Sequence, residues 1–341
     1  MGTFGSTFTE KMLRSTYKNG QWDDFQVTPL TSFALHPGAI VLHYSQSIFE
    51  GLKAYKQPNG TINLFRPEMN VRRFNRSAKR MAMPQLAEQP LLEALSEYVR
   101  TERDSVPERP GSLYLRPAMF ASEAAVGVRP GSEYEFFVIA MPVSSYFSGP
   151  PESSTISVFV AESIKRAAPG GTGAIKAGAN YAITLQAIGH AKSLGCEHVL
   201  FLDSGGRGTL EECGGMNVFI VKDGCLITPP LSDTILAGVT RASILELGAA
   251  KNIPCSEEPI HLGDLKDGIR TGSVSEVFVC GTAATIVSVD SLRFEDGSVL
   301  AIGSKGQYPI SRVLYDDLLD IQYGATADQF GWRYMGSPHQ K

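Results

Sequence analysis

The distribution of apolar residues along the chain predicts strands and helices in two regions. Residues 50–66 form two strand-like runs around an Asn-Gly turn, which favours a β-hairpin. Apolar strands follow at residues 112–120 and 135–141. In the first of these the alternation puts Tyr114 and Arg116 on one face, where an arginine beside a tyrosine suits a carboxylate or simply forms the polar side of an edge strand.

A helical pattern begins after the hairpin and runs from residue 67 to residue 82. Its apolar face consists of Val71, Phe74, Ala78 and Met81. Arg73 belongs neither to this face nor to the charged one, and it lies on a flank with Asn70 and Ser77. An arginine at such a border most often forms a surface ion pair, but it can also reach into a neighbouring cleft.

A stretch rich in Ser, Gly and Pro separates the two regions. Before this linker, the apolar residues of residues 1–35 show little periodicity, and this segment is expected to lie along the surface. Residues 91–105 are expected to form a second amphipathic helix. The clearest linker is at residues 144–153. We therefore expect a small N-terminal α/β domain at residues 1–143 and a larger domain at residues 154–341.

One lysine stands out in the second region. Lys176 follows an apolar strand at residues 155–161 and lies among small residues in the stretch GGTGAIKAGANY, residues 170–181. A lysine in such surroundings loses solvent, which favours the neutral amine, and a neutral amine forms Schiff bases with aldehydes such as pyridoxal phosphate. The alternative is an ordinary surface lysine in a flexible loop. Neither the P-loop pattern nor the dinucleotide fingerprint matches.

A pair of carboxylates leads through two glycines into an apolar strand. Glu211 and Glu212 precede this strand, which starts near Met216. If the segment is extended, the two side chains point to opposite sides. Alternatively, both are exposed to solvent.

Two turns of small residues are suited to anions. A helix starts near Thr240, and the N–H groups at a helix start attract anions, although Thr240 is also suited to ordinary capping. The strand at residues 276–280 ends in the turn Gly-Thr-Ala-Ala at residues 281–284. A further helix is expected at residues 180–194, with Gly195 at its C-terminal end.

The composition narrows the class of protein. The 341 residues are 43% hydrophobic and 19% charged, as in soluble globular enzymes, and the net charge of −4 argues against nucleic acid as the main partner. No apolar run is long enough for a membrane span, and no secretory signal is expected. The five cysteines lack a C-x-x-C pair, which suggests reduced thiols, and the six histidines lack a metal-ligand spacing.

Taken in order, these features resemble the branched-chain aminotransferases, which are pyridoxal-phosphate enzymes of fold type IV. The resemblance runs from about His43 to Trp332. Its most specific stretches are residues 43–55, 64–67, 114–117, 170–181, 212–217, 237–241 and 281–283. It implies an α/β fold of the α+β type in two domains, in which the larger C-terminal domain binds the cofactor and the cofactor lies in the interdomain cleft.

The resemblance also implies a role for individual residues. Lys176 would carry pyridoxal 5'-phosphate as a Schiff base and act as the acid/base, Tyr181 would hydrogen-bond the phenolic oxygen, and Glu212 would pair with the pyridine nitrogen. The phosphate would be held by Arg73, Val239, Thr240 and Thr282. The substrate pocket would be lined by Tyr44, Phe49, Tyr114, Val128 and Tyr146, with Arg116, Thr282 and Ala283 near carboxylates.

The implied reaction moves the amino group of leucine, isoleucine or valine to 2-oxoglutarate by a ping-pong mechanism through pyridoxamine phosphate. The implied enzyme is a cytoplasmic homodimer without a metal, a nucleic-acid partner or a membrane segment. The rival activities on this fold are those of D-amino-acid aminotransferases and aminodeoxychorismate lyases. The residues Tyr114-Leu-Arg116 and Phe49-Glu50-Gly51 argue against both. A non-catalytic ligand-binding protein is a further rival, which the filled catalytic positions disfavour.

Overall fold

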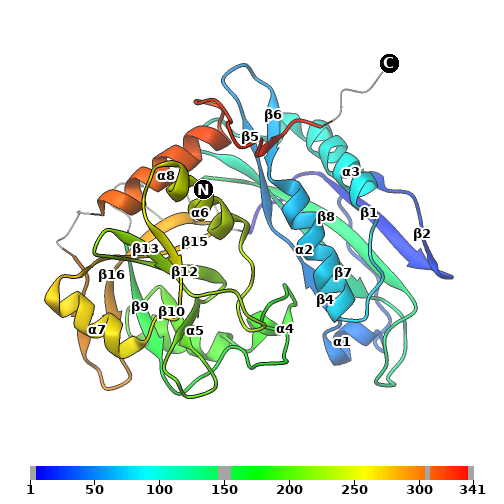
Figure 1. Ribbon diagram of the computed structural model, residues 1–341. Coiled ribbons are helices and arrows are strands. Elements are labelled where there is room, and N and C mark those ends of the chain that lie inside the picture. Colours follow the sequence, from blue (N-terminus) through cyan, green and yellow to red (C-terminus); the bar gives the residue numbers. More distant parts are fainter. Residues whose placement is uncertain (1–4, 145–154, 304–307, 337–341) are drawn as a thin grey trace. The chain divides into compact units, whose positions relative to one another are not determined.

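The computed structural model describes residues 5–144, 155–303 and 308–336 and folds into two compact units (Figure 1). The first unit comprises Met1–Tyr146, Ile175–Ala179 and Asp320–Lys341, and the second comprises Phe147–Ala174 and Asn180–Leu319. The short segment around Lys176 therefore belongs to the first unit. Apart from Ser144, the linker expected at residues 144–153 lies outside the described residues.

The first unit is built on an antiparallel sheet of nine strands. The strand order is β18-β6-β5-β7-β8-β1-β2, with β3 beside β1 and β4 beside β7. The strands are β1 (Lys11–Lys18), β2 (Gln21–Trp22), β3 (Gln26–Pro29), β4 (Ser47–Phe49), β5 (Leu52–Lys56), β6 (Ile62–Phe65), β7 (Ser112–Ala121), β8 (Tyr134–Val143) and β18 (Arg333–Tyr334). The expected hairpin is confirmed as β5 and β6, and the two expected strands are β7 and β8.

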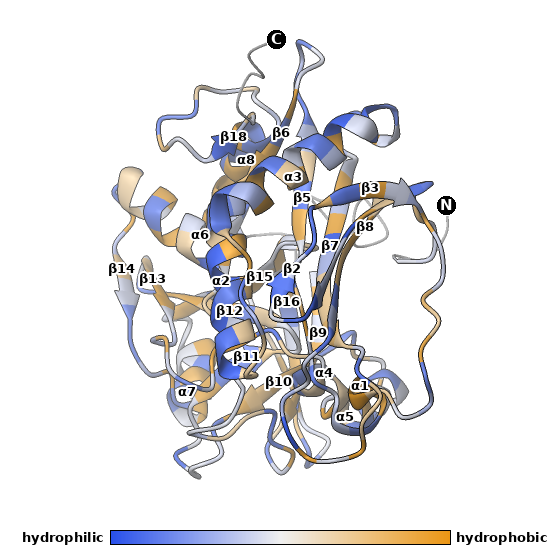
Figure 2. Cartoon of the chain, turned by 90° about the vertical axis from the view of Figure 1, so that its right-hand side faces the viewer, coloured by the Kyte–Doolittle hydropathy of each residue, from blue (hydrophilic) through white to orange (hydrophobic). Residues whose placement is uncertain are grey.

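Helices α2 and α3 pack side by side against one face of this sheet (Figure 1). The helices of this part of the chain are α1 (Ile40–Tyr44), α2 (Pro67–Arg80), α3 (Glu88–Thr101) and the short 3-10 helix Arg103–Ser105. Val71, Phe74 and Ala78 of α2 are buried in the core, as the helical wheel predicts. Figure 2 shows α2 largely in hydrophilic colours, because its other face carries arginine and lysine.

Part of the N-terminal segment belongs to the sheet, which corrects the expectation for residues 1–35, whereas most of residues 19–35 are exposed as expected. Strand β1 pairs with β8 along six residues, and its Met12 and Leu13 are buried. The apolar pair is followed by Arg14, Ser15 and Thr16, so no apolar alternation marks this strand in the sequence. Pairing with β8, which is distant in sequence, gives the segment its strand structure.

The second unit contains a sheet that closes on itself. The strand order is β11-β10-β9-β16-β15-β12-β13-β14, with β17 beside β16, and β11 also pairs with β12. This extra pairing joins six strands into a barrel. The strands are β9 (Thr155–Ala161), β10 (His198–Leu202), β11 (Leu210–Cys213), β12 (Met216–Lys222), β13 (Cys225–Thr228), β14 (Cys255–Glu257), β15 (Val274–Gly281), β16 (Thr285–Arg293) and β17 (Val299–Ala301).

The helix expected at residues 180–194 is interrupted, which corrects the prediction. The remaining helices are α4 (Ala179–Ala182), α5 (Leu185–Ser193), α6 (Val239–Ala250), α7 (Leu262–Thr271) and α8 (Pro309–Gln322). The Thr184 hydroxyl donates to the Tyr181 carbonyl at 2.7 Å, and a threonine that bonds nearby backbone in this way competes with helical hydrogen bonding. Gly195 follows α5 with a φ of 76°, in agreement with its expected role at the helix end. Among the helices that the structure describes, none combines the length and the apolar character needed to cross a bilayer.

Candidate active site

The backbone on both sides of Lys176 is held by β4 and α2. The Lys176 carbonyl accepts a hydrogen bond from the Phe49 N–H at 3.0 Å, and its N–H donates to Ser77 Oγ at 3.1 Å. Ala177, which is fully buried, forms an isolated antiparallel bridge with Ile48. The Lys176 ammonium lies 4.8 Å from the centre of the Phe49 ring. Backbone hydrogen bonds to β4 and α2 therefore hold the segment that carries Lys176, and the alternative of a flexible surface loop is wrong.

Arg73 forms a buried ion pair with Glu50. Its Nε and Nη2 donate to the two carboxylate oxygens at 2.6 and 2.8 Å, and Asn70 Nδ2 donates to Glu50 Oε2 at 2.8 Å. Burial alone would raise the pKa of Glu50, but the charges of Arg73 and Lys176 and the hydrogen bonds from Arg73 and Asn70 together lower it below its usual value. Arg73 is only 4% exposed, so the expected surface ion pair is in fact a buried one.

The flank of α2 that carries Arg73 is thus the side that meets this site. Asn70, Arg73 and Ser77 lie three and four residues apart, which places them on one side of a helix. Asn70 and Arg73 hold Glu50, and Ser77 holds the Lys176 backbone. The helical periodicity of the sequence placed these three residues on one flank, but it could not identify the residues that they bind.

Phe49, Tyr114 and Arg116 form a second group beside Lys176. Arg116 Nη2 donates to the Tyr114 hydroxyl at 3.1 Å, and the guanidinium lies 4.7 Å from the centre of the Phe49 ring. Arg116 Nε is buried without a partner. A side chain at Gly51 would overlap the Tyr114 hydroxyl, so glycine is required there. The predicted sharing of a strand face by Tyr114 and Arg116 is confirmed.

Lys53 is a second cation on this sheet face, and nothing in the sequence pattern distinguishes it from other lysines. It pairs across the strands with Tyr114, so the two side chains share a face. Lys53 is buried, and this burial lowers its pKa to about 8. It is therefore the lysine with which Lys176 must be compared in any chemical labelling.

Two expected pocket residues are exposed in the described chain. Val128 is 86% exposed and Tyr44 is 40% exposed, with the Tyr44 hydroxyl bonded to the Val126 carbonyl. Tyr146 lies outside the described residues.

In the second unit, Glu212 is a buried carboxylate with several donors. Its Oε1 accepts from the Leu236 N–H at 2.7 Å and from Asn217 Nδ2 at 3.4 Å, and its Oε2 lies 3.1 Å from Arg166 Nη2. Glu212 faces Asn217 across the β11–β12 turn. Arg166 carries no signal in the sequence, because it lies in an irregular loop far from Glu212 in the chain.

Glu211 is buried as well, so the alternative of two solvent-exposed carboxylates is wrong. Strands β10 and β11 pair at Leu200↔Cys213 and at Leu202↔Leu210, so three steps along β11 match two along β10. The extra residue is a β-bulge, and a bulge breaks the simple alternation of side chains. All four residues of β11 are buried, so both faces of this strand are covered and a carboxylate on either face is buried.

The backbone N–H groups at the start of α6 have no side-chain cap. Gly238 is the N-cap residue and provides no side-chain cap, and Val239 and Thr240 form the first turn. Thr240 is buried within the helix and does not cap it, so the capping alternative is wrong. Backbone N–H groups at a helix start bind anions readily.

We expect Gly238→Ala to destabilise the protein by about 1–3 kcal/mol, the usual cost of overpacking. A Cβ at this position would overlap Asn217 Oδ1, and Asn217 is held by its hydrogen bonds to Glu212 and the Leu236 carbonyl. Denaturant unfolding measures the loss. Gly263→Ala is the matched control, because a Cβ in the first turn of α7 meets nothing within 4 Å. Equal stability of the two variants would contradict the packing argument.

The other predicted residues of the second unit lie near the same β11–β12 turn. A Cβ at Gly215 would lie 2.9 Å from the Tyr181 ring, so glycine leaves room for that ring. Thr282 and Ala283 lie in the turn between β15 and β16, and Gly281 packs near Met216. The turn ends in Thr285, whose φ of 63° is unusual for a β-branched residue. Such backbone strain concentrates at functional sites.

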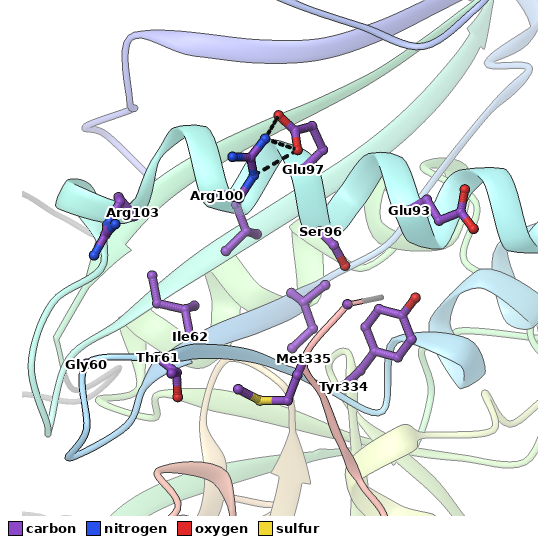
Figure 3. Close-up of a pocket in the computed structure, with 13 residues that line it drawn as sticks. Gly60, Thr61, Ile62, Glu93, Ser96, Glu97, Arg100, Arg103, Tyr334 and Met335 are labelled. Carbon is purple, nitrogen blue, oxygen red and sulfur yellow. Dashed lines mark hydrogen bonds and ion pairs between the residues drawn. The ribbon is translucent and has the colours of Figure 1, made fainter. Parts of the chain in front are cut away.

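A pocket of about 650 Å³ in the first unit contains none of the predicted site residues (Figure 3). It lies between the β6 side of the sheet and α3, with Ile62, Leu64 and Val99 as apolar walls. On its rim, Arg100 is paired with Glu97 at 2.6 Å. Among the described residues, no group of three or more His, Cys, Asp and Glu side chains is arranged to hold a metal ion.

Known proteins that are similar in sequence belong to the family that the sequence motifs resemble. Residues 47–292 match the family model described as amino-transferase class IV. The branched-chain-amino-acid aminotransferase of Mycolicibacterium smegmatis is 41% identical over 337 residues, which cover 96% of this chain and 90% of that protein.

Solved structures of similar proteins share the fold over nearly the whole chain. The branched-chain amino acid aminotransferase of Escherichia coli superposes with a TM-score of 0.77 and 29% identity, over 94% of this chain and 98% of that one. The T.th. branched-chain amino acid aminotransferase, complexed with N-(5'-phosphopyridoxyl)-L-glutamate, has a TM-score of 0.76 and 26% identity over the same shares. The extent of these matches and the family model place the chain in the amino-transferase class IV family, to which it belongs as a relative of the branched-chain-amino-acid aminotransferases.

Proposed function

We propose that this protein transfers the amino group of leucine, isoleucine or valine to 2-oxoglutarate in a ping-pong reaction that uses pyridoxal 5'-phosphate. The observation that carries the proposal is Lys176, whose backbone is held by Phe49 and Ser77 next to the buried Arg73–Glu50 pair. The names of the relatives support the substrate class, and the phosphopyridoxyl ligand of the T.th. enzyme supports the cofactor.

The residues present fit such a cofactor in their chemistry. Once bound, pyridoxal phosphate supplies a ring that withdraws electrons from the substrate. Glu212 is a buried carboxylate, which suits a protonated ring nitrogen. The uncapped start of α6 and the Thr240 hydroxyl suit a phosphate group.

In this proposal each residue has one task. Lys176 Nζ holds the cofactor and then moves a proton at the substrate Cα, while Tyr181 bonds the phenolic oxygen and Glu212 bonds the ring nitrogen. Glu50 keeps the Arg73 guanidinium in position through two hydrogen bonds. The phosphate ligands are Arg73, Val239, Thr240 and Thr282.

The proposed substrate pocket has an apolar part and a cationic part. Phe49 and Tyr114 supply apolar ring surface beside Lys176, and Arg116 lies at its edge. The remaining proposed pocket residues are Tyr44, Val128 and Tyr146, with Thr282 and Ala283 near the substrate carboxylate. An apolar side chain then packs on the rings, whereas the second carboxylate of glutamate requires a cation.

Absorption spectroscopy of the purified protein tests the proposed reaction. After addition of pyridoxal phosphate, a visible band is expected, and L-leucine, L-isoleucine and L-valine are expected to bleach it. A coupled assay with 2-oxoglutarate should then show turnover with these three amino acids. Bleaching by D-amino acids alone, or a protein that binds no cofactor, would contradict the proposal.

Arg116→Ala is expected to separate the two half-reactions. Removing one partner of a buried, hydrogen-bonded charge pair costs about 2–5 kcal/mol. Since each 1.4 kcal/mol is about tenfold, kcat/KM for 2-oxoglutarate should fall by at least about 30-fold. The leucine half-reaction should fall much less, because its side chain needs no cation. In the substrate-free protein Tyr114 already holds Arg116, which lets leucine bind without leaving the guanidinium unpaired.

Single-turnover measurements of each half-reaction check this prediction. Arg76→Ala is a suitable control, because Arg76 lies on the exposed face of α2. Equal losses with leucine and 2-oxoglutarate would mean that Arg116 binds the shared α-carboxylate or supports the fold.

We further propose that the enzyme works in the cytoplasm as a homodimer. Leu42 and Tyr44 of α1 and Val126 and Val128 of the loop after β7 are exposed apolar side chains, and the Tyr44 hydroxyl joins the two segments by donating to the Val126 carbonyl. Exposed apolar groups of this kind are typical of protein interfaces. The five cysteines are free thiols, which supports a reducing compartment. Light scattering of the purified protein, repeated with Val128→Lys, tests the dimer.

A further inference from the structure

Glu211 and Glu212 are neighbouring buried carboxyls with unequal partners. Glu212 receives the Leu236 N–H, Asn217 Nδ2 and Arg166, so both of its oxygens are satisfied. Glu211 receives the Thr234 hydroxyl on Oε1 at 2.6 Å, whereas its Oε2 is buried without a partner. A buried carboxylate oxygen without a donor is costly, but a protonated one is not charged.

The charges around Glu211 do not compensate for its burial. The charged groups that act on it are Arg166 from the loop after β9 and Asp203 and Arg207 from the turn after β10, while Glu212 is its neighbour in the chain. Burial is the largest effect on the pKa of Glu211 and raises it, and Asp203 raises it further. The Thr234 hydrogen bond, Arg166 and Arg207 lower the pKa by less, so the net shift is upward. Arg166 is the buried cation of this group, and it already pairs with Glu212.

We propose that Glu211 is a neutral acid in the cofactor-free protein and that it releases its proton when a protonated cofactor ring binds at Glu212. This inference rests on the proposed function of Glu212 as the partner of the ring nitrogen. Glu211 is thereby a positioning residue, which acts on the cofactor through the charge of the Arg166–Glu212 pair.

A charge count gives the reason. Without the cofactor, the positive charge of Arg166 balances the negative charge of Glu212, and a neutral Glu211 keeps this buried group uncharged. A protonated ring adds one positive charge, which an ionised Glu211 balances. The proton leaves Glu211 Oε2 for solvent, and no bond of the cofactor is formed or broken in this step.

Proton release makes cofactor binding depend on pH in a defined direction. Because Glu211 holds its proton in the free protein and loses it in the complex, affinity rises with pH between the two pKa values of Glu211. One released proton contributes up to about tenfold in affinity per pH unit. Glutamine at position 211 stays neutral at every pH and lacks this contribution.

The test compares cofactor affinity in the wild type and Glu211→Gln between about pH 5.5 and about pH 8.5, a range that spans the values reached by a raised carboxyl pKa. The probe is pyridoxamine 5'-phosphate, which has no aldehyde to react with Lys176, and binding is followed by fluorescence. The affinity of the wild type relative to Glu211→Gln is expected to rise with pH, by up to about tenfold per pH unit between the two pKa values of Glu211, and to level off outside them. Glu258→Gln, an exposed carboxylate, should follow the wild type throughout.

Three results decide the inference. An affinity ratio that stays constant across the pH range would overturn it, because Glu211 would then act only by packing or stay ionised. If the wild type binds no pyridoxamine phosphate at any pH, the proposed function fails, and this inference fails with it. If Glu211→Gln does not fold, Thr234→Val replaces it. This variant removes the Glu211 hydrogen bond and should shift the rise in affinity to higher pH, so an unshifted curve would overturn the inference.

Discussion

Lys176→Ala is expected to abolish turnover and covalent attachment of the cofactor. The reason is chemical, because alanine has no amine to attach the cofactor or to move the substrate proton. The backbone should survive the change, because the bonds from Phe49 and to Ser77 involve main-chain atoms of residue 176. The variant should therefore unfold at nearly the wild-type denaturant concentration while its activity falls to background.

Borohydride reduction followed by peptide mapping identifies the attached lysine. The label is expected on Lys176 in the wild type and should be absent in Lys176→Ala. Lys53 is the competitor to watch, since burial lowers its pKa to about 8 and it lies on the same sheet face as Tyr114. A label on Lys53 would contradict the assignment. Lys192→Ala, which changes an exposed lysine of α5, should leave both labelling and activity unchanged.

Much of the first unit was predictable because its elements have local signals. The Asn-Gly turn marks the β5–β6 hairpin, and the apolar stripe of Val71, Phe74 and Ala78 marks α2. The alternation in β7 placed Tyr114 and Arg116 on one face without knowledge of their partners. These signals depend on residues a few positions apart, which a sequence displays directly.

The parts that sequence could not predict depend on distant partners or on backbone irregularity. Strand β1 is ordered by β8, more than a hundred residues away, and its own pattern is weak. Arg73 reads as a border residue until Glu50 is seen beside it. Both faces of β11 are covered, so Glu211 and Glu212 are both buried, which the sequence of this segment alone does not show.

The family resemblance contributed what periodicity could not. It gave Arg73, Tyr181 and Glu212 their expected roles, whereas spacing alone left each with an ordinary structural alternative. The structure adds the residues that support them: Glu50 for Arg73, Gly215 for Tyr181, and Arg166 and Asn217 for Glu212. Arg166 had no signal in the sequence, since nothing in its loop indicates which strand it reaches.

Glu212→Gln is expected to retain the cofactor but to lower kcat by at least about 100-fold, in the range seen when one preorganised electrostatic group is removed. A neutral amide cannot stabilise a protonated ring nitrogen, so the ring withdraws electrons less well. The amide oxygen can still accept from the Leu236 N–H, but its NH₂ group then faces Arg166, where two donors meet. We therefore also expect a stability loss of about 1–3 kcal/mol, the usual cost of an unsatisfied buried polar group.

Steady-state kinetics at saturating cofactor, together with denaturant unfolding, separate the two effects of Glu212→Gln. Glu211→Gln is the matched control, because it makes the same chemical change at the neighbouring buried position. Below the lower of the two pKa values of Glu211, where it is neutral both with and without the cofactor, its substitution should leave kcat close to the wild-type value. A large loss of kcat in Glu211→Gln with none in Glu212→Gln would show that Glu211 bonds the ring nitrogen. That result would be hard to reconcile with the donors that converge on Glu212, which hold its carboxylate in one orientation before any cofactor arrives.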